Sequence, residues 1–210
     1  GGGSCGASPP SWYNCAWNYR KNLTINSTMV TGTQIGFPVL VNLPSDSNLA
    51  ASARVDGYDI LFTDANGLKI PHGIENFTKS TGALVAWVRV PNVTSACNTS
   101  IYMYYNNSGA SNQQNPWSVW DNNYRGVWHF KEDPSGTAPQ MKDSTEVLSH
   151  GTSDGSMTSG DQVAGKIGGS LDFDNTDDII NASRNDRIND LESGGGFTVS
   201  AWIYPNTSQS

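Results

Sequence analysis

Two runs of β-branched and aromatic residues limit the folds available to this chain. They are Ala83–Val90 (ALVAWVRV) and Thr99–Tyr105 (TSIYMYY). Such side chains are enriched in strands, where they pack on a pleated, half-buried surface. No segment carries a sustained helical period, and the nearest candidate, 184–191, is flanked by Asn, Asp and Gly and predicts one helical turn at most. The sequence therefore predicts an all-β fold with these two runs at the centre of the sheets.

Shorter runs predict the neighbouring strands. Residues 20–25 and 37–43 alternate polar with apolar side chains, as half-buried strands do. Residues 59–63 and 68–72 are separated by a turn that contains Asn66-Gly67. Asn-Gly between apolar runs is a strong hairpin signal, so these two runs are expected to pair.

Charge and hydropathy narrow the classes of partner. Charged residues make up 15% of the chain, its formal net charge is −7, and its Lys and Arg residues are scattered. A nucleic-acid binder needs a basic patch, so nucleic acid is not an expected partner. No apolar run approaches the roughly 20 residues that span a bilayer, so no membrane span is expected either. An acidic surface fits either simple solubility or the binding of divalent cations.

Cysteines and sequons suggest the compartment. Of the three cysteines, Cys5 and Cys15 are expected to form a disulfide; a zinc site is the weaker alternative because the usual ligand spacing is missing. Cys97 is expected to be a small buried residue. N-x-[ST] sequons predict glycosylation of an extracellular or cell-surface protein, although many arise by chance in so Asn-, Ser- and Thr-rich a chain. The sequon asparagines are Asn22, Asn26, Asn76, Asn92, Asn98, Asn106, Asn181 and Asn206.

Composition also suggests the domain organisation. Residues 1–16 contain Pro9-Pro10 and no period, which predicts an N-terminal arm. A first β domain is expected over 17–115, ending in the polar, Gly- and Asn-rich linker 108–116. A second domain is expected over 116–210.

Residues 17 to about 120 resemble a known family, the domain of unknown function 2341. The resemblance rests on runs that follow the family's order and spacing: WNYRKNLTI (17–25), GFPVLV (36–41), GYDILFTD (57–64), LVAWVRVP (84–91) and IYMYYNN (101–107). It implies a β domain of a bacterial or archaeal surface protein, in which such a domain commonly precedes a jelly roll. The family carries no agreed chemistry to transfer. Its usual Gly-Asp-Asp-Ile is Gly57-Tyr58-Asp59-Ile60 here, with one carboxylate fewer.

The remainder, about 124–210, resembles the opening half of a laminin-G-like, concanavalin-A-type lectin/glucanase jelly roll. The runs concerned are GVWHF (126–130), DST (143–145), HGT (150–152), GKIGGSLDF (165–173) and FTVSAWIYP (197–205). The two resemblances together imply two β-sandwich, jelly-roll-like domains in tandem. Further strands should follow in such a jelly roll, so the second domain is expected to be incomplete. A longer parent protein, strands supplied by a neighbouring chain and a disordered remainder are the three explanations.

Catalysis is not expected. Jelly rolls of this class that are hydrolases carry E-x-D-x-x-E, which places acid and nucleophile on one strand face, and the motif is missing here. The pairs Glu132-Asp133 and Asp177-Asp178 are adjacent residues, which do not share a face. His129 lies in a strand-like run with no nucleophile motif, so a structural role is favoured. Glycoside hydrolysis is a remote alternative.

Calcium is the one cofactor that the sequence suggests. Hard oxygen ligands crowd the loop that carries Asp172, Asp174, Asp177 and Asp178, and Asp143 could add another. The resemblance supports this, because many relatives of the jelly roll hold a calcium ion. An ordinary solvated turn is the alternative.

These observations favour a non-catalytic extracellular or cell-surface protein with a structural or adhesive role. The expected partner is a second copy, in a filament or coat, with strand donation as one way to associate. The alternative is a calcium-assisted, lectin-like module that binds a polysaccharide, for which Trp202 is the nearest aromatic candidate.

Overall fold

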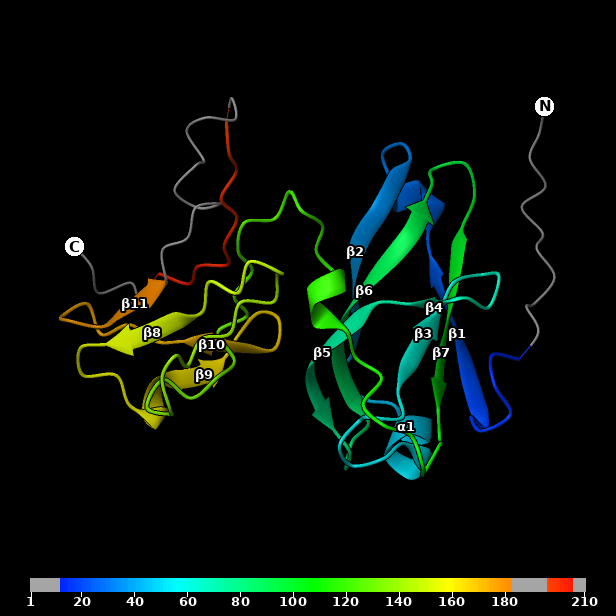
Figure 1. Ribbon diagram of the computed structural model, residues 1–210, viewed down its shortest axis with the longest axis horizontal. Coiled ribbons are helices and arrows are strands. Elements are labelled where there is room, and N and C mark those ends of the chain that lie inside the picture. Colours follow the sequence, from blue (N-terminus) through cyan, green and yellow to red (C-terminus); the bar gives the residue numbers. More distant parts are fainter. Residues whose placement is uncertain (1–11, 183–195, 206–210) are drawn as a thin grey trace. The chain divides into compact units, whose positions relative to one another are not determined.

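The computed structural model describes residues 12–182 and 196–205 and has an all-β fold, as predicted. The described residues form two compact units (Figure 1). The first contains residues 12–124 and 144–146, and the second contains 125–143, 147–182 and 196–205. The predicted helical turn at 184–191 lies outside the described residues. No helix in the described ranges is long and apolar enough to cross a membrane.

The first unit is built from two antiparallel sheets. Four strands form one sheet in the order β1 (Tyr19–Ile25), β7 (Thr99–Tyr105), β3 (Leu61–Thr63), β4 (Lys69–Ile70). Three strands form the other in the order β2 (Gln34–Leu43), β6 (Ala83–Val93), β5 (His72–Thr78). The two runs expected at the sheet centres are confirmed, because β7 and β6 each have a strand on both sides. The Asn66-Gly67 hairpin is confirmed too, with Thr63 of β3 opposite Lys69 of β4.

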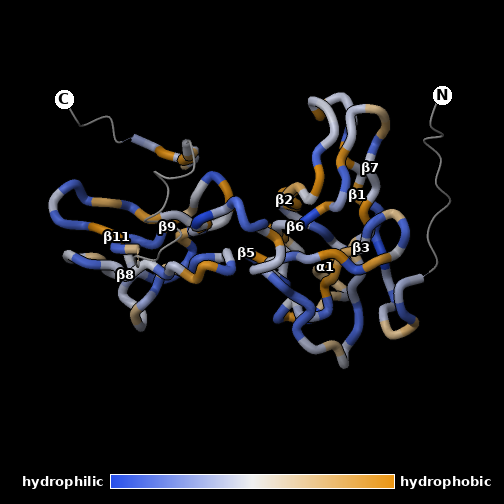
Figure 2. Tube along the Cα trace, turned by 45° about the horizontal axis from the view of Figure 1, so that its top comes forward, coloured by the Kyte–Doolittle hydropathy of each residue, from blue (hydrophilic) through white to orange (hydrophobic). Residues whose placement is uncertain are grey.

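One hydrophobic cluster lies between these sheets. Alternate residues of β6, namely Leu84, Ala86, Val88 and Val90, are buried in it, together with residues of β3 and β7 from the facing sheet. This period of two is what a strand with one covered face requires. In Figure 2, where the chain is coloured by hydropathy, hydrophobic and hydrophilic residues follow one another along these strands. The sheets are therefore held mainly by burial of apolar surface.

A short helix, α1 (Ser47–Ser52), was not expected from the sequence. Asp46 caps it by accepting hydrogen bonds from the backbone N–H groups of Asn48 and Leu49, at 3.0 Å each. Leu49 on its inner face is fully buried in the cluster. Six residues are too few to show a helical period, so capping and tertiary burial decide this element.

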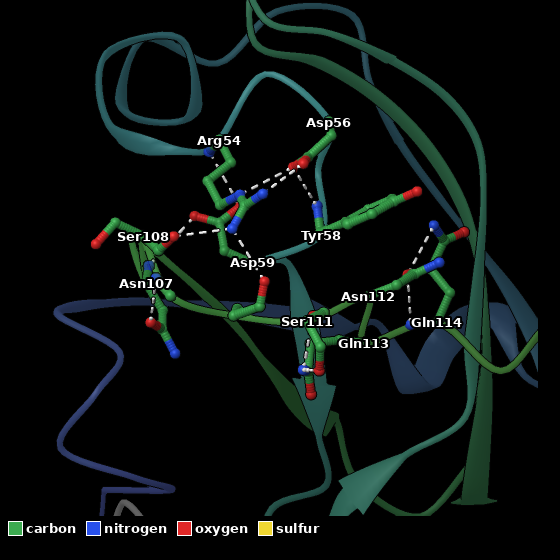
Figure 3. A network of polar contacts seen from close by, with 12 residues as sticks. Arg54, Asp56, Tyr58, Asp59, Asn107, Ser108, Ser111, Asn112, Gln113 and Gln114 are labelled. Atoms are coloured by element: carbon green, nitrogen blue, oxygen red, sulfur yellow. Dashed lines mark hydrogen bonds and ion pairs between the residues drawn. The ribbon is translucent and has the colours of Figure 1, made fainter.

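The segment 108–116, which composition predicts to be a linker, is instead packed on the first unit (Figure 3). The Arg54 guanidinium donates to the carbonyl oxygens of Ser108 and Ala110, at 2.8 and 3.0 Å. Farther along, the Gln114 side chain accepts from the N–H of Ile74 in β5, and the Asn115 N–H donates to the carbonyl of His72. The segment thus covers the outer edge of β5 before the 3₁₀ turn η2 (Pro116–Ser118).

The second unit has shorter strands. β8 (Gly151–Asp154) pairs with β11 (Ile179–Ala182), and β9 (Gln162–Ala164) pairs with β10 (Gly169–Leu171). The chain also makes two isolated bridges, Trp128 with Asp143 and Met141 with Gly151. The remaining 3₁₀ turns are η1 (Ser27–Met29), in the first unit, and η3 (Ser159–Asp161). Residues 196–205 form no strand or helix.

Candidate functional site

A groove lies between two edge strands of the first unit, β1 and β2. Among the described residues β1 pairs with β7 alone and β2 with β6 alone, so each has a free edge. The groove has a volume of about 280 Å³. Its apolar lining comes mostly from side chains that also contact the core, and none of its lining residues is charged. The apolar lining residues are Leu23, Ile25, Val39, Leu40, Val41, Leu43 and Ile101.

The opposite side of this unit is closed. There the chain passes from β4 into β5 through Pro71, whose carbonyl accepts the N–H of Arg89 in β6 at 2.9 Å. The segment 108–116 then covers the free edge of β5. An exposed edge presents unpaired N–H and C=O groups to any other strand, so the unit can accept one on the β1 and β2 side.

An ion pair fixes one end of the groove. Lys21, at the start of β1, binds the carboxylate of Asp46, three residues beyond the end of β2. Burial works to raise the pKa of Asp46, but hydrogen bonds from Lys21 and from backbone N–H groups outweigh it and lower that pKa. Because the start of β1 lies beside the end of β2, the two free edges run in opposite directions. A strand between them would run parallel to one and antiparallel to the other.

Two residues interrupt the outer edge of β2 before the groove begins. Gly36 has a φ of 61°, a left-handed conformation that favours glycine. Pro38 has no N–H, and proline is found in edge strands for that reason. The groove lining starts at the next residue, Val39. Only the stretch from Val39 to Leu43 therefore offers a continuous edge of β2.

Three of the predicted calcium ligands come together. One carboxylate oxygen from each of Asp174, Asp177 and Asp178 lies within 4.8 Å of the others. Hydrogen bonds within the loop shape this arrangement: Asp174 accepts from the N–H of Thr176 at 2.7 Å, and Asp178 accepts from the N–H of Asp174 at 3.0 Å. The bond from Thr176 is the main cause that lowers the pKa of Asp174. The second carboxylate oxygen of Asp178 is shielded from solvent without a hydrogen-bond partner.

The other two predicted ligands lie outside this group. Asp172 is exposed. Asp143 is buried, and its carboxylate accepts the N–H groups of Val127 at 3.0 Å and Ser149 at 2.9 Å. Its own N–H donates to Nδ1 of His150 at 3.0 Å. Asp143 thus ties three segments of the second unit together. A calcium ion at the loop stays a prediction that involves the first three carboxylates.

The predicted modification sites are mostly on the surface. Asn106 is half-buried, and Asn206 lies outside the described residues. Cys15 is exposed and forms no disulfide with another described residue; since Cys5 lies outside the described residues, their pairing stays a prediction. Cys97 is half-buried rather than fully buried. The exposed sequon asparagines are Asn22, Asn26, Asn76, Asn92, Asn98 and Asn181.

Two histidines are held in surroundings that disfavour the charged form. His72 is fully buried against the ring of Phe62, with 5.2 Å between ring centroids, and neither ring nitrogen has a hydrogen-bond partner of good geometry. Burial lowers its pKa to about 4, with a smaller contribution from the charge of Lys69. Burial also lowers the pKa of His129 to about 4.

A structural carboxylate that the sequence did not single out, Asp59, lies two residues before β3. Asp59 is fully buried, and it accepts from the N–H of Arg54 at 3.0 Å and from those of Asn106 and Asn107 at 2.8 and 3.3 Å (Figure 3). Its carbonyl accepts the indole N–H of Trp17 at 2.6 Å. Only its place in the family run Gly57-Tyr58-Asp59-Ile60 could have pointed to it.

Comparison with known proteins gives one match. No curated protein and no solved structure matches this chain. Residues 56–145 match the family model of a domain of unknown function, DUF2341. This stretch includes β3 to β7 and Asp59, which confirms that part of the resemblance read from the sequence. The chain is thus similar to this family over 90 of its 210 residues.

Proposed function

We propose that this chain is a non-catalytic extracellular or cell-surface protein with a structural or adhesive role, a self-associating subunit of a filament or coat. The observation that carries the proposal is the open groove at β1 and β2, which leaves two strand edges and apolar side chains available on one side of a unit whose other side is closed. Edges of this kind pair with other chains unless they are blocked.

Other features support the same proposal. The buried polar groups Asp59 and Asp143 accept backbone N–H groups, which is a role in folding. Apart from Asn22, which lines the groove, the exposed sequon asparagines would carry glycans without disturbing the core or the groove. We take the second unit to be the opening part of a laminin-G-like jelly roll, following the first in tandem.

We expect the purified chain to self-associate as its concentration is raised. Sedimentation velocity and light scattering would report a rising mean mass, and negative-stain images would show particles of repeated subunits. The reason is that association pairs the open strand edges and removes the apolar groove from water, and that burial contributes about 25 cal/mol per Å² before the entropic cost of association is subtracted. A chain that stays monomeric at its highest soluble concentration contradicts this function.

Calcium-assisted polysaccharide binding is the second candidate, favoured by the group of Asp174, Asp177 and Asp178 and by the shielded oxygen of Asp178. Saturating calcium is expected to raise the melting temperature of the second unit by about 5 °C, because the ion binds only the folded loop. Asp178→Asn should abolish the rise, measured by scanning calorimetry. Asp172→Asn is the matched control, since Asp172 lies outside the group, and should keep it. An equal rise in both variants would place the ion elsewhere.

A further inference from the structure

A second feature of the chain matches the groove. Residues 196–205 (GFTVSAWIYP) form no strand, yet apolar and polar residues alternate from Phe197 to Ala201 as they do in a strand. Phe197, Val199 and Ile203 are 63%, 80% and 80% exposed and, with Ala201, fall on one face of an extended segment. Figure 2 shows hydrophobic colouring within this segment. Exposed apolar residues gathered in one segment mark an interaction site.

The segment and the groove agree in length and pattern. β1 offers Asn22–Ile25 and β2 offers Val39–Leu43 along the groove. Five residues of an extended chain cover about 17 Å. The stretch from Phe197 to Tyr204 is long enough to fill that length, and its apolar face would add to the partly buried Leu23, Ile25 and Val39.

A second copy can supply such a strand without burying any charge. The chain carries a net charge of −7, so two copies repel each other at long range, and an uncharged contact adds no further repulsion. The groove lining contains no charged residue, and neither does the segment 196–205. Both partners of the contact are present in every copy, which lets association continue from one copy to the next.

We propose that residues 197–204 of one copy insert as a strand between β1 and β2 of a second copy. This inference rests on the proposed self-association and names the surfaces that perform it. Phe197, Val199, Ala201 and Ile203 face the core of the accepting unit, while Thr198, Ser200, Trp202 and Tyr204 face outward. The inserted backbone hydrogen bonds to the free edges of β1 and β2 and joins the two sheets on their open side.

Two single substitutions test the two halves of the contact. Val199→Asp places a charge on the inserted face and is expected to weaken association at least about tenfold, because the carboxylate would be buried without a partner. Thr198→Asp is its matched control, one residue away on the outward face, and should change association less than about threefold. Leu23→Asp damages the groove, and Val55→Asp, an exposed apolar position outside the groove, is the control for added charge.

Mixing the variants gives the decisive measurement. Leu23→Asp keeps an intact segment and Val199→Asp keeps an intact groove, so each alone should be monomeric. Their mixture should form a one-to-one dimer and nothing larger in sedimentation velocity. Should Leu23→Asp fail to fold, as judged by circular dichroism, a synthetic peptide of residues 196–205 replaces it. That peptide should occupy the groove of the unmodified chain and shorten its assemblies.

The other outcomes separate this inference from the proposed function. If the unmodified chain self-associates and Val199→Asp associates equally well, self-association stands and this contact is wrong. Loss of association on removal of residues 1–11 alone would identify the N-terminal arm as the inserted strand and overturn the proposal. A monomer whose β1 and β2 amides lose hydrogen-exchange protection in Val199→Asp would mean that the segment fills the groove of its own chain.

Discussion

Asp59→Ala is expected to destabilise the first unit by about 4 kcal/mol, because three backbone donors lose their shared acceptor. The carboxylate of Asp59 is fully buried and satisfies the backbone N–H groups of Arg54, Asn106 and Asn107. Each buried donor left without a partner costs about 1–3 kcal/mol. Typical domains have only about 5–15 kcal/mol of stability, so this variant is close to unfolding. Urea unfolding followed by circular dichroism measures the loss.

Asp56→Ala provides the matched control in the same loop. Asp56 is exposed, and its carboxylate binds the Arg54 guanidinium at 2.6 Å and accepts from the N–H of Tyr58 at 3.0 Å. An exposed ion pair contributes up to about 1 kcal/mol, so this variant should remain folded. Asp59→Asn should fall between the two, because one of its oxygens is replaced by an NH₂ group that faces an N–H donor. Equal stability of Asp59→Ala and Asp56→Ala would show that the buried network contributes little.

Acidification is expected to remove about 3 kcal/mol from the stability of the first unit through His72 alone. Its pKa in the folded chain is about 4, against an ordinary value of 6.5. Below pH 6.5 the unfolded chain therefore binds a proton that the folded chain does not bind until the pH nears 4. Each unit of difference between the two pKa values corresponds to about 1.4 kcal/mol of folding stability. This stability is fully present above pH 6.5 and is lost progressively as the pH falls from 6.5 to 4. Around pH 5 the loss should already be about 2 kcal/mol.

His72→Leu tests this origin. Leucine is neutral and close to histidine in volume, and no well-formed side-chain hydrogen bond is lost because both ring nitrogens lack a good partner. Urea unfolding near pH 7 and near pH 5 should show a loss in the unmodified chain and little loss in the variant. A loss of stability between pH 7 and pH 5 is also expected in the second unit, because the pKa of His129 is lowered to about 4 as well. If the first unit of His72→Leu loses as much stability between pH 7 and pH 5 as the unmodified chain does, other groups cause its acid sensitivity.

The sequence predicted elements whose signals are local. The strand β7 has the bounds Thr99–Tyr105 that its branched and aromatic residues indicate, and Asn66-Gly67 forms the expected hairpin. The helix α1 could not be predicted from a six-residue pattern, since the cap Asp46 and the burial of Leu49 create it. The segment 108–116 is rich in the residues of linkers, yet its side-chain and backbone groups hydrogen bond to the first unit.

The candidate sites also differ in whether a local sequence signal or the tertiary fold brings their residues together. The structure brings Asp174, Asp177 and Asp178 together, whereas Asp172, predicted in the same loop, and Asp143, predicted as a further oxygen ligand, lie outside this group. The groove could not be read from the sequence, because it depends on which strands end up at the edges of the two sheets. Its exposed counterpart at 197–204 carries the pattern of an ordinary strand, and only the structure shows that it forms none.

Pro38 has a consequence for how far any β-sheet can grow across neighbouring chains. Open edges are a hazard in crowded surroundings, since flat, unbroken ladders stack without limit into amyloid-like fibrils. The free edge of β2 is interrupted at Gly36 and Pro38, which leaves a run of about five residues for an outside backbone. A run this short can pair with one strand whose side chains fit the groove. It cannot pair along the length of a long strand that does not fit. The edge can therefore remain available to another copy of this chain without nucleating aggregation.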